Sequence, residues 1–174
     1  YGVFKADWPA AKFVREGNAV KTSAAEITVD EAGGALKFKS LVSEAAFAVT
    51  GGVKGNGYEV RFPLAKDERV YGLGDVNRKN IQRRPVRYEI YVKNVNSYIP
   101  IPMAMTSKGW GLLMNTTFKN HFDVGEKDPD AMICSAAESR LDGYVFFGKD
   151  YRALLDIYTQ LTGRSALLPA FGYG

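Results

Sequence analysis

The sequence predicts a mainly β protein, an antiparallel β-sandwich followed by one C-terminal α-helix. Three observations lead to this prediction. Polar and apolar residues alternate with a period of two through most of the first 147 residues, which is typical of strands that bury one face. Glycine, proline and asparagine separate these runs at short intervals, as turns do in a sandwich. Only residues 150–162 have a helical period.

Size and composition agree with one globular domain. The chain has 174 residues, of which 46% are hydrophobic and 24% are charged, so disordered and collagen-like classes are excluded. No apolar stretch approaches the roughly 18 residues of a membrane span, and no membrane partner is expected. We expect residues 1–149 to form the sandwich, residues 150–163 to form a helix packed on it, and residues 164–174 to be a linker.

Five strands are expected in the first part of the chain. Their alternating runs are residues 12–15, 26–30, 35–39, 46–49 and 57–62. Residues 31–34 predict a hairpin loop, because their two glycines can adopt positive φ. Gly51 and Gly52 are expected to end the fourth strand, and Pro63 the fifth.

Seven further strands are expected after residue 67. The runs are residues 68–74, 86–92, 103–105, 111–114, 118–124, 131–134 and 141–147. Residues 107–109, Ser-Lys-Gly, predict a plain hairpin turn. A polar break at residues 94–98 precedes Pro100 and Pro102, which restrict the backbone that leaves it.

One amphipathic helix is expected near the C-terminal end. Asp150 is a favourable N-cap and Gly163 a favourable residue just beyond the helix. The apolar positions follow helical spacing, and they are Tyr151, Leu154, Leu155, Tyr158 and Leu161. We expect Leu154, Leu155, Tyr158 and Leu161 to pack against the sandwich.

The carboxylates do not predict a catalytic site. Acid–base cleavage of a glycosidic bond requires two carboxyl groups that face each other across the bond. The aspartates nearest to predicted loops are Asp75, Asp123, Asp128, Asp130 and Asp142. None has a convincing partner, and Asp128-Pro129-Asp130 is typical of a turn. No catalytic residue is therefore predicted.

Histidine, cysteine and glycine patterns also predict structural roles. His121 is the single histidine and Cys134 the single cysteine, which leaves no histidine pair or cysteine cluster for a metal site. Both lie on predicted strands among apolar residues. Gly72-Leu73-Gly74 is not followed by the third glycine and helix of a dinucleotide fingerprint. No metal or cofactor is expected, and the sequon at Asn115 is expected to be an ordinary strand end.

The charge is mildly basic and concentrated in one stretch. Lysines and arginines exceed acidic residues by 23 − 19 = 4. The dense stretch comprises Arg78, Lys79, Arg83, Arg84 and Arg87. It borders a strand and lacks the interleaved aromatic residues of nucleic-acid surfaces, so we expect a solvated, structural role and no nucleic-acid partner.

One loop has the chemistry of a carbohydrate contact. Asn94, Asn96, Ser97 and Tyr98 combine amide, hydroxyl and phenol groups, which both donate and accept hydrogen bonds. A polyhydroxylated ligand requires such a mixture together with an aromatic face. These four residues are the candidate substrate-binding residues, and an ordinary Asn/Ser turn is the alternative.

Several segments together resemble a known family. Residues 68–75, Glu-Arg-Val-Tyr-Gly-Leu-Gly-Asp, resemble the E-R-[IV]-Y-G-L-G-[ED] segment of glycoside hydrolase family 31, the α-glucosidase and α-xylosidase group. Further resemblances follow in the order of that family, at residues 101–105, 109–115, 122–125, 141–148, 158–164 and 168–171. Phe171 stands where the family usually has tryptophan, and the loop at Asn94 lacks the aspartate of the family's insertion.

The resemblance implies a galactose-mutarotase-like β-sandwich that precedes a (β/α)₈ barrel bearing the catalytic aspartates. It implies a non-catalytic N-terminal domain of a retaining α-glycosidase, which supports the barrel and borders the pocket for an α-linked oligosaccharide. Residues 164–174 would then be the start of that barrel. A free-standing carbohydrate-binding module is the alternative. A mutarotase is disfavoured, because its acid–base chemistry typically uses histidine with glutamate and His121 stands alone.

Overall fold

The computed structural model describes residues 14–76, 80–92, 99–166 and 169–173. Within them the chain forms strands, one α-helix and a short 3-10 helix η1 at Ala170–Tyr173. The strands are β1 (Val14–Glu16), β2 (Ala19–Lys21), β3 (Ala25–Asp30), β4 (Ala35–Ser40), β5 (Ala46–Lys54), β6 (Gly57–Pro63), β7 (Val70–Asp75), β8 (Val86–Ile90), β9 (Ile99–Thr106), β10 (Trp110–Met114), β11 (Asn120–Val124), β12 (Ala131–Ala136) and β13 (Gly143–Phe147).

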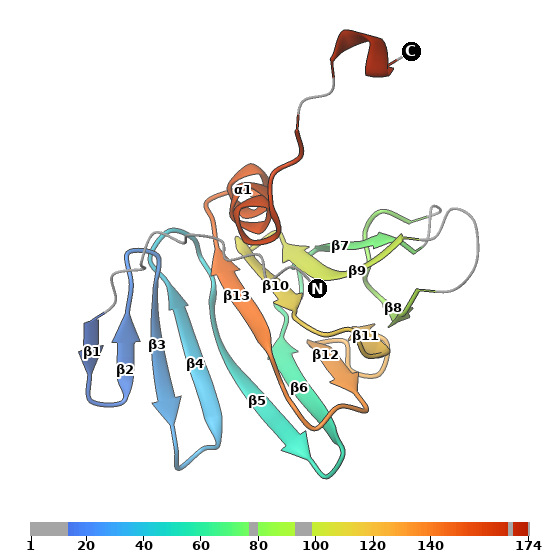
Figure 1. The fold of residues 1–174 in the computed structure, drawn as a ribbon. Helices are drawn as coiled ribbons and strands as arrows, with labels where there is room; N and C mark the ends of the chain where they lie inside the picture. The colour runs from blue at the N-terminus through green and yellow to red at the C-terminus, as the bar shows by residue number, and fades with distance from the viewer. Residues whose placement is uncertain (1–13, 77–79, 93–98, 167–168, 174) are drawn as a thin grey trace.

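The strands form two antiparallel sheets, which confirms the predicted β-sandwich (Figure 1). The large sheet has nine strands in the order β1-β2-β3-β4-β5-β6-β12-β11-β8. The small sheet has four, in the order β13-β10-β9-β7. Because the small sheet is narrower, it covers only part of the large one.

The main core lies between the two sheets. Alternate residues of the strands point inward, so that Phe62 on β6 and Phe122 on β11 meet Trp110 and Leu112 of β10 in one cluster. The rings of Phe62 and Trp110 stack with centroids 5.7 Å apart. Burial of these large side chains is the principal source of stability in this layer.

Helix α1 (Tyr151–Thr162) adds a third layer on the outer face of the small sheet (Figure 1). Asp150 caps it as predicted, since its Oδ1 accepts a hydrogen bond of 2.8 Å from the backbone N–H of Ala153. A second core forms between the helix and the sheet, and its buried members are Met103, Met105, Phe146 and Leu154.

The predicted contact face of the helix is wrong at one position. Leu154 is 0% exposed, but Leu155 is 44% exposed, and Ile157 packs on the second core in its place. Successive residues are about 100° apart around a helix. The buried stripe is centred on Leu154, Tyr158 and Leu161, and Leu155 therefore lies on its solvent side.

Several strand boundaries also differ from the predictions. Strand β5 continues through Gly51 and Gly52, because Gly51 has φ of 95° and a Cβ there would lie 2.2 Å from the carbonyl oxygen of Glu59. The glycines thus allow close pairing with β6. Strand β2 was not predicted. Strand β9 begins at Ile99 and contains both Pro100 and Pro102.

The large sheet extends beyond the small one as a wing, which we define as strands β1–β4 (Figure 1). At its inner end, the ring of Phe38 lies 6.4 Å from that of Phe147 on β13, the outermost strand of the small sheet. Further out, Val29 and Leu36 are 39% and 42% exposed. The strands of the wing keep the alternating pattern of the core. Among the described residues, however, no second layer covers the apolar side chains of the wing.

Candidate functional site

The four candidate residues Asn94, Asn96, Ser97 and Tyr98 lie outside the described residues. The structure does place the two strands that flank them. Strand β8 is the outermost strand of the large sheet, and β9 lies inside the small sheet. The connection between them therefore passes from one sheet to the other.

A second connection leaves the same end of the sandwich. Ile99, the first residue of β9, pairs with Asp75, the last residue of β7. The chain after Asp75 and the chain before Ile99 therefore start side by side. We call this place the loop end, and its exposed apolar residues are Ile81, Tyr91, Val92 and Ile99.

Strand β7 is distorted just before the loop end. Gly72, Leu73 and Gly74 have φ of 109°, 63° and 70°, and the pairing with β9 shifts between Gly72 and Gly74. A Cβ at Gly72 would lie 2.4 Å from the oxygen of Met103, and one at Gly74 would lie 2.0 Å from the oxygen of Ile99. Glycine is therefore required at both positions, and the G-L-G motif makes a bulge.

Arg83 stabilises this bulge from the side. Its Nε donates to the oxygen of Gly72 at 2.9 Å, and its Nη2 donates to the oxygen of Gly74 at 2.9 Å. Its Nη1 donates to the oxygen of Asn80 at 2.8 Å. The guanidinium also lies 5.6 Å from the centroid of the Tyr88 ring. The rigid fork of arginine thus ties the bulge to the connection that follows it.

Arg84 has a similar role on the other side of the chain. Its Nη1 donates to the oxygens of Ala65 and Glu68 at 2.7 and 3.0 Å, and its Nη2 donates to the oxygen of Pro129. The contacts of Arg83 and Arg84 agree with the structural role that was predicted for the basic stretch, but the predicted solvation is wrong for Arg83, which is 6% exposed, while Arg84 is half-buried. Both side chains bind backbone oxygens, because the bulge and the turns leave these oxygens outside the strand ladders.

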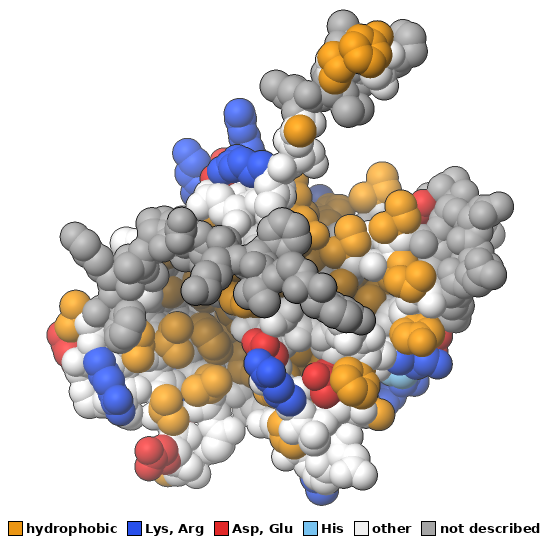
Figure 2. Space-filling view, viewed as in Figure 1, with side chains coloured by type: hydrophobic (Ala, Val, Ile, Leu, Met, Phe, Trp, Pro, Cys, Tyr) orange, Lys and Arg blue, Asp and Glu red, His pale blue; other side chains and the backbone are white. Residues whose placement is uncertain are grey.

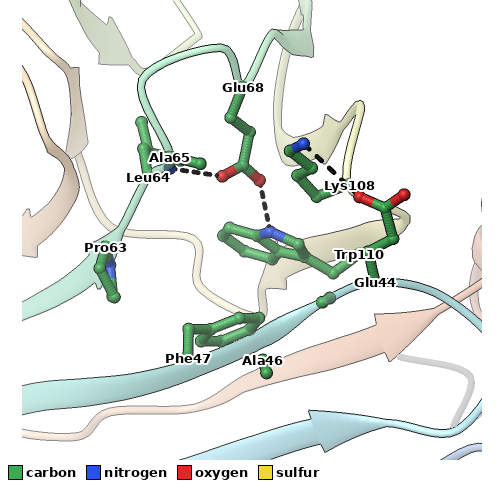
Figure 3. A pocket seen from close by; sticks show the side chains of 10 residues that line it. Glu44, Ala46, Phe47, Pro63, Leu64, Ala65, Glu68, Lys108 and Trp110 are labelled. Atoms are coloured by element: carbon green, nitrogen blue, oxygen red, sulfur yellow. Dashed lines mark hydrogen bonds and ion pairs between the residues drawn. The ribbon is translucent and has the colours of Figure 1, made fainter.

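The first residue of the motif, Glu68, is buried between the sheets (Figure 3). Its Oε1 accepts a hydrogen bond of 2.7 Å from Nε1 of Trp110, and its Oε2 accepts one of 2.9 Å from the backbone N–H of Ala65. The carboxylate links the end of β6 to β10, and both of its oxygens already have partners. It is therefore built for structure rather than for proton transfer.

A pocket of about 450 Å³ opens beside Glu68 (Figure 3). Phe47, Leu64 and Trp110 line its apolar side. At the rim, Nζ of Lys108 lies 3.5 Å from Glu44 and 2.9 Å from Asp67. Lys108 pairs with both carboxylates, so the pocket is an apolar hollow whose rim keeps a net negative charge.

The other residues that the sequence analysis considered for catalysis or metal binding make contacts typical of structural roles. Burial raises the pKa of the Cys134 thiol above its ordinary value, so the thiol stays protonated. The Oδ1 of Asp128 accepts a hydrogen bond from the backbone N–H of Asp130, as expected for a turn. Nε2 of His121 lies 3.7 Å from Glu89 at the sheet surface. Asp142 accepts hydrogen bonds from Asn115 and Arg140.

Asp123 is the one buried aspartate among the described carboxylates. Its Oδ1 accepts hydrogen bonds from the backbone N–H groups of Glu126 and Lys127, at 3.0 and 3.1 Å. These bonds hold the turn after β11.

Across the described ranges, no three histidine, cysteine or acidic side chains gather in a metal-binding group. In the same ranges, no helix has the length and apolar character to cross a membrane.

Sequence reasoning missed the roles of Arg83 and Arg84. One signal could have found them. Glycine in the interior of a strand indicates a bulge, and a bulge leaves backbone oxygens that require donors. The G-L-G motif therefore indicated that donor side chains would lie near the bulge. The basic stretch that follows it in sequence contains such donors.

Comparison with known proteins agrees with this architecture. The family model for the "Glycosyl hydrolase 31 N-terminal galactose mutarotase-like domain" matches residues 11–123. An α-glucosidase of Saccharolobus solfataricus is 31% identical in an alignment 133 residues long, which covers 69% of this chain and 19% of that protein. The α-xylosidase XylQ of Lactiplantibacillus pentosus is 28% identical over 123 residues, covering 62% of this chain and 15% of that protein.

Solved structures show the same fold. A GH31 α-xylosidase from a soil metagenome, complexed with xylose, matches with a TM-score of 0.77 at 18% identity, over 95% of this chain and 29% of that chain. This chain therefore spans less than a third of the length of the relatives described here.

Proposed function

This chain belongs to the family of glycosyl hydrolase 31 N-terminal galactose mutarotase-like domains, and on that premise we propose its role. It is the non-catalytic N-terminal domain of a retaining α-glycosidase of the α-glucosidase or α-xylosidase type. It supports a catalytic barrel and places its loop end at the border of the carbohydrate pocket. One observation carries the proposal. The connection after β7 and the connection before β9 leave the same end of the sandwich, where Arg83 holds the β7 bulge by hydrogen bonds.

The construction of the loop end supports this role. Arg83 and the β7 bulge fix the base from which both connections leave. The exposed Ile81, Tyr91, Val92 and Ile99 surround that base and are suited to contact with another domain. A rigid base with a polar loop above it is how proteins commonly present binding residues.

The segment after helix α1 also supports a barrel partner. Helix α1 covers the small sheet, and the segment after it rises away from the sandwich (Figure 1). Phe171 on η1 is 86% exposed. An apolar side chain in such a place is typical of a segment that packs against a further domain.

The loop residues would select the sugar without taking part in bond cleavage. Asn96 and Tyr98 are neutral at ordinary pH and can form hydrogen bonds with hydroxyl groups. An amide cannot protonate a leaving group. We expect them to contact the sugar beyond the cleaved bond, so they would influence which leaving sugar is preferred.

The test is kinetic and uses the full-length enzyme. Asn96→Ala and Tyr98→Ala are compared with the parent on substrates that differ only in the leaving sugar. Each lost neutral hydrogen bond costs about 0.5–1.5 kcal/mol, so we expect a several-fold change of kcat/KM for some leaving sugars. Asn56→Ala, in the turn between β5 and β6, is the matched control. If all variants treat every leaving sugar as the parent does, the loop is only a turn.

A free-standing carbohydrate-binding module is the second candidate, and the pocket beside Trp110 favours it as a hollow of ligand size. Calorimetric titration of this chain with isomalto-oligosaccharides separates the two. Saturable binding by the chain alone supports the module, and no binding supports the domain role.

Neither candidate predicts turnover of an aryl α-glucoside by this chain. Activity that is lost on replacing one of its aspartates would contradict both.

A further inference from the structure

The outer face of the small sheet is only partly covered by helix α1. Leu112 and Met114 of β10 belong to the main core, so Leu113 between them points to the opposite, outer face. Tyr144 of β13 pairs with Leu113 and therefore shares this face. Leu113 packs on the second core, but Tyr144 is 43% exposed. The helix thus leaves one aromatic side chain of this face in contact with solvent.

A hydrogen-bonded group of polar side chains lies beside Tyr144. The backbone N–H of Asn115 donates to the oxygen of Asp142 at 3.0 Å, so the pairing of β10 with β13 continues for one residue beyond each strand. Alternation places Asn115 and Asp142 on the face of Tyr144. Oδ2 of Asp142 accepts hydrogen bonds from Nδ2 of Asn115 at 2.9 Å and from Nη2 of Arg140 at 3.0 Å. These two bonds hold the three side chains together.

This arrangement has the chemistry that a carbohydrate requires. Among the described residues, Oδ1 of Asp142 and Oδ1 of Asn115 remain as acceptors, and further N–H groups of Arg140 remain as donors. The hydroxyl groups of a sugar both donate and accept, and its apolar ring face packs on an aromatic ring such as that of Tyr144. Because the polar side chains already hold one another, little side-chain freedom is lost when a ligand binds.

The group lies at the edge of the small sheet that bears the loop end. Strand β9 begins at the loop end and β10 runs antiparallel to it, so β10 ends at the same edge. Ile101 of β9 packs on the second core and lies on the outer face, between the loop end and the polar group. From β9 to β13 is two strand spacings, or about 10 Å. Figure 2 shows hydrophobic side chains over β7, β8 and β9 beside α1, so the surface next to the loop end supplies further apolar contacts.

We propose that Tyr144, Asn115, Asp142 and Arg140 form an accessory subsite for an α-linked oligosaccharide, at a unit beyond the leaving sugar. This inference rests on the proposed function, which places the loop end at the border of the carbohydrate pocket. An oligosaccharide that extends from the pocket past the loop end reaches the accessory subsite, and a disaccharide does not.

The accessory subsite acts together with the pocket. An open surface with few contacts binds a sugar weakly by itself. When the pocket holds one end of an oligosaccharide, binding of the other end becomes intramolecular and is favoured by a high effective concentration. The accessory subsite therefore does not require measurable binding of a short sugar by this chain alone.

The test is kinetic and uses the full-length enzyme with a disaccharide and a longer oligosaccharide of the same linkage. The measured quantity is the ratio of kcat/KM for the longer substrate to kcat/KM for the disaccharide. Tyr144→Ala and Arg140→Ala should each lower this ratio several-fold, because each removes a contact that only the longer substrate makes. Leu155→Ala on α1, where the residue is 44% exposed, is the matched control and should keep the ratio of the parent. Arg140 is exposed, so its variant is informative even if Tyr144→Ala does not fold.

Three results would overturn the proposal. The first is a ratio equal to that of the parent in both variants. The second is an equal loss on both substrates, which would show that this face packs on another part of the enzyme. The third is an equally lowered ratio in Leu155→Ala. The proposed function is tested separately, because Asn96→Ala and Tyr98→Ala act on the choice of leaving sugar. An effect in those variants without one at Tyr144 and Arg140 would remove the accessory subsite and retain the proposed function.

Discussion

The closed part of the sandwich and the wing are built from the same large sheet but differ in what covers them. In the closed part, Val60 on β6 is 3% exposed beneath the small sheet. In the wing, Val29 on β3 is 39% exposed on the same face. Both residues stand in alternating strands with apolar neighbours. The comparison teaches that alternation determines which face is apolar, while the neighbouring layer determines whether that face is buried.

Two polar ties of the closed part are made by the buried side chains Glu68 and Arg83. Glu68 joins the two sheets through Trp110, and Arg83 and Arg84 hold the carbonyls of the bulge and of nearby turns. Ion pairs of the wing, such as Lys37 with Asp30, lie near solvent and contribute little to stability. We therefore expect the closed part to determine the free energy of unfolding, and four tests examine this.

The largest effect is expected where the third layer meets the small sheet. Leu154→Ala should lower the free energy of unfolding by about 2–5 kcal/mol, because it empties a fully buried site. Leu155→Ala is the matched control on the solvent side of the same helix and should change stability by less than about 0.5 kcal/mol. Urea unfolding of the two variants measures the difference. Similar midpoints would show that α1 is not packed on the sheet.

The second test compares equal truncations in the two regions. Val60→Ala should cost about 2 kcal/mol, since it removes two buried methyl groups and leaves a small cavity. Val29→Ala should cost under about 1 kcal/mol, because part of its surface stays in water. Both are measured by chemical denaturation at one pH. A cost at Val29 as large as that at Val60 would remove the distinction between the regions.

The third test concerns the buried tie between the sheets. Glu68→Gln replaces one accepting oxygen by a donor, so either Trp110 or Ala65 loses its acceptor. We expect a loss of about 1–3 kcal/mol, which is typical of a buried group without its partner. Glu44→Gln, at the exposed rim of the pocket, is the control and should have little effect. Equal unfolding midpoints for the two variants would contradict the role of Glu68.

The smallest effect at neutral pH is expected at Tyr58. Its hydroxyl is buried and has no hydrogen-bond partner among the described residues, so Tyr58→Phe should raise the free energy of unfolding by about 1 kcal/mol, because it removes an unpaired polar group. Burial raises the pKa of Tyr58 above its ordinary value. An unfolded tyrosine loses its proton near pH 10 while the folded one keeps it, so stability should fall as pH rises above about 10.

Thermal unfolding of the parent and Tyr58→Phe between neutral pH and pH 11 measures this effect. The parent should lose stability more steeply at the alkaline end, because only its unfolded state releases the tyrosine proton. Cys134 contributes a decline of the same sign in both proteins, since burial also raises the pKa of its thiol. Parallel curves for the two proteins would show that Tyr58 ionises equally well in the folded state.

The sequence by itself determined the class of the fold and the order of most of its elements. A period of two is expressed locally, because successive side chains of a strand point to opposite faces, and Asp150 and Gly163 mark the helix by local capping chemistry. The joint order of several short segments over residues 68–174 also indicated the family. These signals depend on neighbouring residues only, and they were therefore readable without the structure.

Only the tertiary structure decided which apolar positions are buried and which polar groups meet. Leu154 and Leu155 have equal hydrophobicity, and the docking angle of α1 on the small sheet separates them. Gly51 and Gly52 would end a strand in isolation, but the close approach of β6 keeps them inside β5. Arg83 resembles a solvated charge in sequence, and it is buried because the bulge presents unpaired oxygens from a strand eleven residues away. A local pattern such as Gly-Leu-Gly can indicate that donors are needed, but the packing of both sheets decides which side chain supplies them.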